Sequence, residues 1–130
     1  MPKTNMTPAE IEQYLNGFCG TETWTKHFTN MLLMTDGILA MRECCNAFWL
    51  TDVAASAQTR KLREQCGGFQ VWTLKRNGNG CVIECRKDTG MPALYSQNLE
   101  YTDFPLDEFK FYIAETGGGH PPTMMLTSEY

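Results

Sequence analysis

Two histidines and six cysteines are the side chains of this 130-residue sequence best suited to nucleophilic or metal chemistry. A nucleophilic hydroxyl or thiol needs a neighbouring base, and His27 and His120 are the only histidines that could supply one. Folding could pair His27 with Cys19 or Cys44, but the sequence has neither the serine motif of α/β-hydrolases nor a protease-type cysteine motif. We therefore name no catalytic residue, and a hydrolase is the third of three functional hypotheses.

The cysteines lack the spacing of a metal site. Cys44 and Cys45 are adjacent, Cys81 and Cys85 are four positions apart, and no two cysteines are separated by two residues as in zinc ribbons. The N-terminal residues are polar rather than apolar like a signal peptide, so we expect a cytoplasmic protein with reduced thiols. Most of these thiols should pack as small hydrophobic groups, and we expect neither a metal nor a cofactor.

Other candidate sites have simpler structural explanations. Asp52 falls in an apolar helical run and should face the surface or be capped. Asp103, Asp107 and Glu108 could ligate a cation, but they lack the calcium-loop pattern and should be solvated. The glycines of the 117–122 segment lack the lysine of a phosphate loop, so this segment should be a hairpin tip.

Charge is distributed unevenly along the chain. Residues 60–87 hold seven of the 11 basic side chains, whereas residues 100–130 hold six acids and one base. The predicted hairpin geometry should bring together five cations, which we predict as a partner-binding patch: Arg60, Lys61, Arg63, Arg86 and Lys87. The alternative is a solvated helix end without a ligand.

Aromatic side chains are expected mainly in the core. Trp49, Trp72, Phe48 and Tyr101 should fill it, because aromatics at such spacings usually do. Trp24 is flanked by polar residues and is the one aromatic that we add to the partner-binding surface.

Helical patterns dominate the first half of the chain. Thr7-Pro8-Ala9-Glu10 is a capping box that begins a helix ending at Gly17. A second helix should follow Thr35 and end near Cys45, and a third should be capped by Asn46 and continue as far as Gly67, with an apolar stripe of Leu50, Val53, Ala54 and Ala57. Residues 18–30 are interpreted as a loop or a short irregular element.

Strand patterns dominate the second half. Residues 69–74 and 81–85 flank Asn77-Gly78-Asn79-Gly80, a strong hairpin signal. Further strands are predicted at 94–101, 109–113 and 124–126. The predicted fold is a single α+β domain over residues 1–130, in which two or three N-terminal helices pack on a four- to five-stranded antiparallel meander. With 42% hydrophobic residues and no long apolar run, we expect no membrane contact.

An ordered series of short motifs resembles a small family of unknown function found in bacteria, phages and other mobile elements. The motifs are Gly20-Thr21-Glu22-Thr23-Trp24, Thr35-Asp36-Gly37, Ala47-Phe48-Trp49-Leu50-Thr51-Asp52-Val53-Ala54, Phe69-Gln70-Val71-Trp72, Glu100-Tyr101-Thr102-Asp103-Phe104-Pro105-Leu106-Asp107-Glu108 and Ser128-Glu129-Tyr130. The resemblance covers about residues 18–130, leaves the 1–17 helix outside the pattern and makes 117–122 an insertion. It implies no activity and no site residues.

These observations favour a non-enzymatic accessory protein of phage or mobile-element type that binds a macromolecule. Its most specific form is an anti-CRISPR-like inhibitor of a bacterial defence system, with a protein partner. Because the net charge is −4, we expect only weak binding of free nucleic acid. The alternative function is a module that binds a nucleotide or a small metabolite in a pocket.

Overall fold

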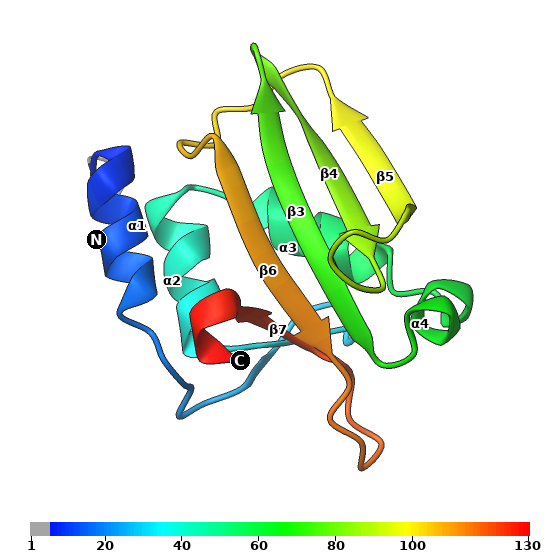
Figure 1. Ribbon diagram of the computed structural model, residues 1–130. Coiled ribbons are helices and arrows are strands. Elements are labelled where there is room, and N and C mark those ends of the chain that lie inside the picture. The colour runs from blue at the N-terminus through cyan, green and yellow to red at the C-terminus, as the bar shows by residue number, and fades with distance from the viewer. Residues whose placement is uncertain (1–5) are drawn as a thin grey trace.

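The computed structural model describes residues 6–130 (Figure 1). Four α-helices, seven strands and a final 3₁₀ turn follow one another in the order α1 (Pro8–Asn16), β1 (Thr25–Lys26), β2 (Leu33–Met34), α2 (Asp36–Cys44), α3 (Phe48–Ser56), α4 (Arg60–Cys66), β3 (Phe69–Asn77), β4 (Gly80–Arg86), β5 (Ala93–Leu99), β6 (Glu108–Ala114), β7 (Thr123–Leu126) and η1 (Thr127–Glu129). The α+β class is confirmed. The numbers of helices and strands both exceed those predicted.

All seven strands belong to one sheet of order β1-β2-β7-β6-β3-β4-β5. Strand β6 pairs with β3 rather than with β5, so the predicted meander is interrupted after β5. Strand β2 pairs in parallel with β7, with Leu33 opposite Thr123, so the sheet is not wholly antiparallel. Both departures depend on contacts between distant segments, which local periodicity does not report.

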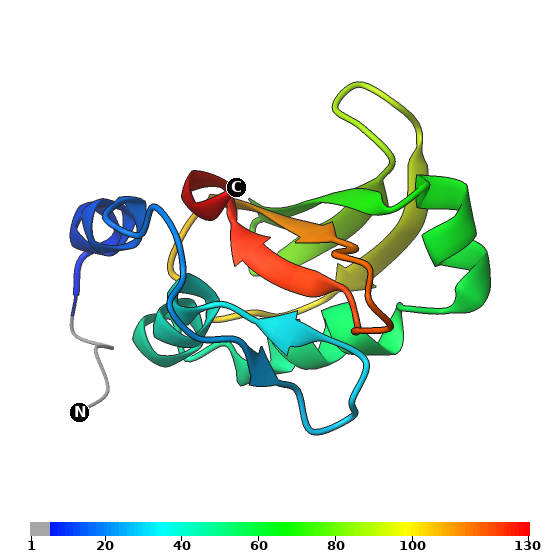
Figure 2. The same cartoon turned by 90° about the horizontal axis from the view of Figure 1, so that it is seen from below.

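Helices cover one face of this sheet. Figures 1 and 2 show α2 and α3 behind the sheet, with α1 and α4 towards its two ends. The largest fully buried side chains lie between the sheet and these helices: Trp72, Phe104, Phe111, Ile11, Leu32, Ile38, Met41, Leu50, Leu74, Ile83, Ile113 and Met124. The opposite face of the sheet therefore stays available to solvent over much of β3, β4 and β6.

Two local predictions are confirmed in detail. Thr7 caps α1, since its N–H donates to Glu10 Oε1 at 2.8 Å while Glu10 N–H donates to Thr7 Oγ1 at 3.2 Å. Strands β3 and β4 form the predicted hairpin, with Asn77 opposite Gly80. Both features are set by residues close in sequence, which is why sequence patterns find them.

The predicted long third helix is wrong in two respects. Asn46 does not cap it: the N-cap is Ala47, which makes no side-chain cap. The helix also stops at Ser56, and Thr59 begins a separate α4 by accepting a hydrogen bond from Leu62 N–H at 3.2 Å. Between them the Gln58 amide turns into the core and exchanges hydrogen bonds of 2.9 and 2.7 Å with Gln70 on β3, which favours a break there.

The interpretation of residues 18–30 as a loop is also corrected, because Thr25–Lys26 is strand β1. A two-residue strand is too short to show an alternating pattern, and only its pairing with β2 defines it. The third predicted strand is confirmed as β5, although it ends at Leu99 rather than residue 101.

The predicted inward face of α3 is confirmed at Leu50, Ala54 and Ala57, which are buried, whereas Val53 is half-buried. Cysteine packing also agrees with expectation. Five cysteines are buried and Cys19 is exposed. No helix within residues 6–130 is long and apolar enough to cross a membrane.

Candidate interaction surface

Several motif residues meet at the start of α2 and have structural roles there. Glu129 accepts hydrogen bonds from the Thr35 hydroxyl at 2.6 Å and from Gly37 N–H at 3.0 Å. Thr21 Oγ1 accepts one from Asp36 N–H at 2.9 Å. The backbone N–H groups at the start of a helix need such acceptors. The segments around residues 21, 36 and 129 thus hold the N-terminus of α2 in place.

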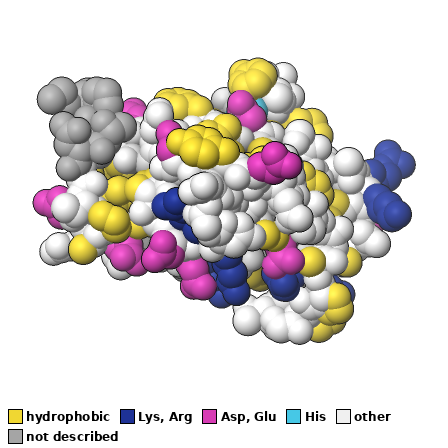
Figure 3. All heavy atoms as spheres, turned by 90° about the horizontal axis from the view of Figure 1, so that it is seen from above, with side chains coloured by type: hydrophobic (Ala, Val, Ile, Leu, Met, Phe, Trp, Pro, Cys, Tyr) yellow, Lys and Arg dark blue, Asp and Glu magenta, His cyan; other side chains and the backbone are white. Residues whose placement is uncertain are grey.

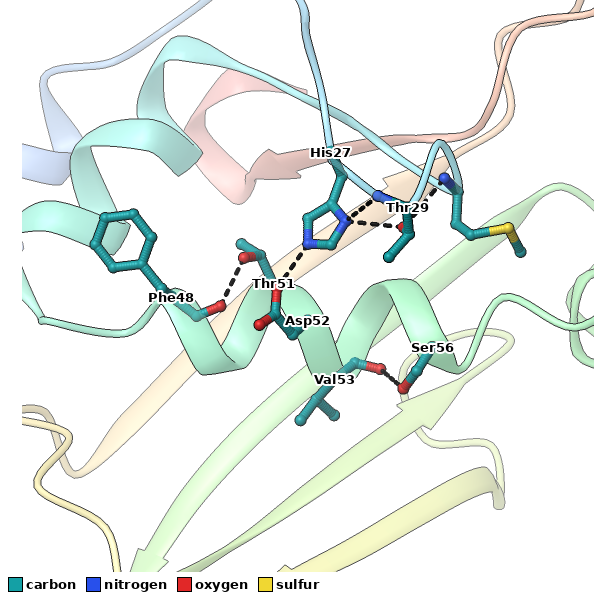
Figure 4. Close-up of polar contacts among 8 residues, drawn as sticks. His27, Thr29, Phe48, Thr51, Asp52, Val53 and Ser56 are labelled. Carbon is teal, nitrogen blue, oxygen red and sulfur yellow. Dashed lines mark hydrogen bonds and ion pairs between the residues drawn. The ribbon is translucent and has the colours of Figure 1, made fainter.

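A second motif contact joins the β1–β2 hairpin to α3 through His27 (Figure 4). The His27 side chain is 1% exposed, and its Nε2 lies 2.7 Å from Asp52 Oδ1. Its Nδ1 accepts a hydrogen bond from Thr29 N–H at 3.2 Å and lies 2.8 Å from Thr29 Oγ1. Because an amide can only donate, Nδ1 is the acceptor nitrogen, and the ring proton resides on Nε2 facing Asp52.

The resulting order of hydroxyl, imidazole and carboxylate resembles a catalytic triad. It is better explained as a structural contact that holds the β1–β2 hairpin against α3. Thr29 Oγ1 also accepts a hydrogen bond from Met31 N–H at 3.3 Å, which closes the turn between the strands. The Phe28 ring lies 4.5 Å from the His27 ring and covers it. The hydrogen-bond partners of the His27 ring in the described part of the chain are thus Thr29 and, from α3, Asp52, rather than the Cys19 or Cys44 that the sequence left conceivable.

Asp52 has the surface position expected for it, with its side chain 52% exposed, but it also receives the hydrogen bond from His27. The predicted solvation of the other acids is confirmed for Asp103, Asp107 and Glu108, which are all exposed. Within residues 6–130, no three His, Cys, Asp or Glu side chains gather as a metal site would require.

Helix α3 carries apolar residues on two sides. Its inner side buries Leu50 and Ala54, while Phe48 is 49% exposed on the outside and Trp49 and Val53 are half-buried. The exposed polar residues of α3 are Asp52 and Ser56, so large apolar side chains share its outer side with few polar ones. The outer side of α3 is therefore an unusual place for large apolar side chains.

Neighbouring segments extend this apolar area. Phe28 is 79% exposed and Tyr101 is 75% exposed, one on each side of α3. Between Tyr101 and the helix there is a hollow of about 340 Å³, lined by Trp49, Val53, Leu99, Tyr101, Thr102 and Asp103. We define the α3 face as Phe28, Phe48, Trp49, Asp52, Val53 and Tyr101.

The α3 face combines aromatic rings with carboxylates. Asp52 and Asp103 are exposed within or beside it. Arg42 lies over the Phe48 ring, with its guanidinium carbon 4.6 Å from the ring centre. Burial lowers the pKa of Arg42, while the charge of Asp52 opposes that shift. Figure 3 shows yellow hydrophobic and magenta acidic side chains interspersed on the helix side of the molecule.

The sequence-based expectation that Phe48 and Tyr101 fill the core is wrong, whereas Trp72 is buried as predicted. A usable signal was present in the sequence. Residues 47–50 and 53–55 are all apolar, so the few polar residues of the helix, Thr51, Asp52 and Ser56, cannot cover its whole outer side. Burying one side of such a helix leaves aromatic residues on the other.

The predicted basic patch is only partly available. Arg63 makes a two-pronged ion pair with Glu115, with N···O distances of 2.9 and 3.2 Å. Arg86 pairs with Glu84 at 2.8 Å. Arg60, Lys61 and Lys87 are exposed, and within the described part of the chain they form no ion pair. Figure 3 shows dark blue side chains projecting at the end of the molecule where α4 lies.

Trp24 has the surface position predicted for it and is 55% exposed. It lines a hollow of about 350 Å³ with Leu33, Thr123 and two residues that flank the 117–119 glycines, Thr116 and His120. That segment is the tip between β6 and β7, as its sequence indicated. None of the five predicted basic residues lines this hollow.

A family model described as "Family of unknown function (DUF6876)" matches residues 9–130. The chain belongs to this family. Comparison with curated proteins finds no match, and comparison with solved structures finds none either. The family match begins inside α1, whereas the motifs listed above begin only after that helix. Family membership supplies no activity, so function must be argued from the surface itself.

Proposed function

We propose that the protein is a non-enzymatic binding protein that docks a protein partner on its α3 face. The observation that carries this proposal is the exposure of Phe48 on α3, a helix with few polar residues, together with the exposed rings of Phe28 and Tyr101. Exposed apolar clusters of this kind mark interaction sites in folded proteins. Aromatic residues also supply much of the binding energy at protein interfaces.

The partner's contact surface is proposed to be apolar with basic side chains. Asp52 and Asp103 offer carboxylates at the α3 face, and exposed aromatic rings attract guanidinium and ammonium groups. Charge complementarity of this kind favours a basic partner and disfavours an acidic one. The narrower hypothesis of an anti-CRISPR-like inhibitor from a phage or mobile element rests on the sequence resemblance alone.

The alternative of a nucleotide or metabolite pocket has less support. The largest hollow described, of about 400 Å³, lies beside α4. It is lined by two cations, Arg60 and Arg63, and by two carboxylates, Glu64 and Glu115, so it offers little net positive charge for a phosphate. The triad-like residues of the hydrolase hypothesis are similarly occupied in closing a turn.

The test compares two exposed apolar residues that differ in position but not in exposure. Phe48 on the α3 face is 49% exposed and Met91 in the β4–β5 turn is 48% exposed. Three variants would be immobilised beside the unaltered protein: the single variant Phe48→Ser, the double variant Phe28→Ser/Phe48→Ser and the control Met91→Ser. Proteins retained from a bacterial lysate would be quantified by mass spectrometry, and a retained protein would then be purified and titrated against each variant.

We expect the double variant to bind the retained protein more than tenfold more weakly, because truncating a central aromatic anchor costs about 2 kcal/mol or more. Met91→Ser should bind as the unaltered protein does. Binding should survive high salt better than a purely ionic contact would. Equal affinities of all variants for every retained protein would overturn the proposal.

A further inference from the structure

Strand β5 leaves one long edge of the sheet unpaired. Among the described residues it pairs with β4 only, and it is the last strand in the sheet order. Figure 1 shows α4 beyond the N-terminal end of β5, and within residues 6–130 no ribbon runs along its outer side. The other edge of the sheet is β1, which has two residues, whereas β5 has seven.

The composition of β5 does not discourage further pairing. Its sequence, ALYSQNL, contains no charged residue and no proline. Natural proteins normally protect a long edge strand with charges, proline or a covering segment, because its free N–H and C=O groups can bind another strand. Its side chains are all exposed or half-buried, and Leu94 is 38% exposed.

We propose that β5 pairs with β5 of a second copy of this chain, antiparallel about a two-fold axis at Ser96, so that one sheet runs through both copies. Ser96 is the middle residue of the strand, so this register gives the longest overlap. The interface is isologous, with each copy using the same surface. This proposal is independent of the partner docking on the α3 face.

The register places complementary side chains opposite each other. Tyr95 lies opposite Gln97 of the second copy on the core side of the sheet. The register of β5 against β4 shifts at Leu94, which has no partner on β4, so the regular part of the edge is Tyr95–Leu99. Within one chain the Tyr95 hydroxyl already donates to Gln97 Oε1 at 2.8 Å, so the same pair of groups is available across the axis. No like charges face each other within the paired strands.

Charges beyond the strand ends favour the antiparallel arrangement of two copies. Arg86, opposite Ala93, is neutralised by Glu84, but Lys87 follows it, and the exposed Arg60 and Lys61 begin α4 beyond the same end of β5; Asp88 is the acid next to Lys87. Glu100 follows the end of the strand, and Asp103 is near. The two-fold axis brings the basic end of each β5 towards the acidic end of the other. A neutral strand with one basic end and one acidic end complements a second copy of itself.

The experiment uses a charge exchange at the axis. Ser96 is exposed, so Ser96→Lys and Ser96→Glu should leave the isolated chain folded, with thermal midpoints close to that of the unaltered protein. In the proposed pair residue 96 faces itself, so each variant opposes like charges. Gln13→Lys adds the same charge at an exposed position on α1, at the far end of the molecule from β5 (Figure 1), and serves as the matched control.

Sedimentation velocity over a wide range of protein concentration measures the result. We expect the unaltered protein and Gln13→Lys to reach twice the chain mass of 14.8 kDa. Ser96→Lys and Ser96→Glu should each dissociate at least tenfold more readily, and an equimolar mixture of the two should recover the dimer, because Lys then faces Glu. Amide hydrogen exchange should show β5 protected in the dimer and unprotected in Ser96→Lys.

Three results would overturn the proposal. The unaltered protein could be a monomer at every concentration; a foreign peptide strand would then be the remaining occupant of this edge. Ser96→Lys could stay dimeric, which would locate the interface elsewhere. If both variants dissociated but their mixture did not recover the dimer, residue 96 would not face itself. Phe48→Ser should leave dimerisation unchanged, which separates this test from that of the α3 face.

Discussion

The carboxylate of Glu129 accepts a hydrogen bond from the backbone N–H of Gly37, 92 positions earlier in the chain, at 3.0 Å. The approach is so close that a Cβ on residue 37 would lie 2.6 Å from Glu129 Oε1. Glycine is needed here for space, because the end of the chain packs directly on the start of α2. This contact joins the C-terminal turn η1 to helix α2.

Gly37→Ala should therefore destabilise the protein by about 1–3 kcal/mol, since the added methyl group must displace the Glu129 carboxylate or Leu126. Urea denaturation followed by circular dichroism measures this change. Gly20→Ala is the control, because a Cβ at residue 20 meets no atom within 4 Å. Equal losses of stability in the two variants would contradict the spatial explanation.

Leu50→Ala should reduce the free energy of unfolding by about 2–5 kcal/mol, because the side chain is fully buried between α3 and the sheet. Ser56→Ala, on the exposed side of the same helix, should change it by no more than about 0.5 kcal/mol. Chemical denaturation of both variants tests the assignment of the inner side. A Leu50→Ala change as small as that of the control would mean that the wrong side was chosen.

Acid should weaken the anchoring of α2 through Asp36. The Thr23 hydroxyl and Glu22 N–H donate hydrogen bonds to the Asp36 carboxylate and hold its pKa below the ordinary value. A lowered pKa stabilises the folded state at pH values above the ordinary aspartate pKa of about 3.9, and this stabilisation is lost as the pH falls through the lower, folded-state pKa.

Stability measured from neutral pH down to the acid transition should thus fall less steeply in Asp36→Asn than in the unaltered protein. Asp107→Asn removes another exposed carboxylate and should follow the unaltered curve. Parallel curves for all three proteins would exclude a contribution from Asp36.

Thiol reactivity should separate Cys19 from the other cysteines. Cys19 is exposed, and burial raises the pKa of Cys66, Cys81 and Cys85, which disfavours their reactive thiolate forms. A chromogenic thiol reagent should react rapidly with one thiol in the native protein and with none in Cys19→Ser. Under denaturing, non-reducing conditions the unaltered protein should show six; a lower count, or stoichiometric zinc in the purified protein, would contradict the prediction.

The predicted basic patch remains a second candidate surface, now reduced to Arg60, Lys61 and Lys87. Reversing these three charges to Glu should weaken binding of an acidic partner in a salt-dependent way and leave the thermal midpoint nearly unchanged. Affinity measured at two salt concentrations gives the result. If Asp52→Lys/Asp103→Lys abolished binding while the triple variant bound normally, the contact would belong to the α3 face instead.

Local features of this protein follow from its sequence alone. The capping box at Thr7 and the turn between Asn77 and Gly80 involve residues within a few positions of each other, so their types suffice to predict them. The inner side of α3 follows from helical spacing for the same reason. Family membership could likewise be inferred from the order of short motifs.

Only the tertiary structure decided the rest, because the interactions concerned join distant residues. The parallel pairing of β2 with β7 and the bond between His27 and Asp52 have no local signature. Sequence spacing predicted that Arg63 belongs to a basic patch. In the folded protein Glu115 forms an ion pair with Arg63 and neutralises its charge. Aromatic residues such as Phe48 resemble core residues in any sequence, and which side of an apolar helix stays uncovered depends on how much of it the sheet can bury.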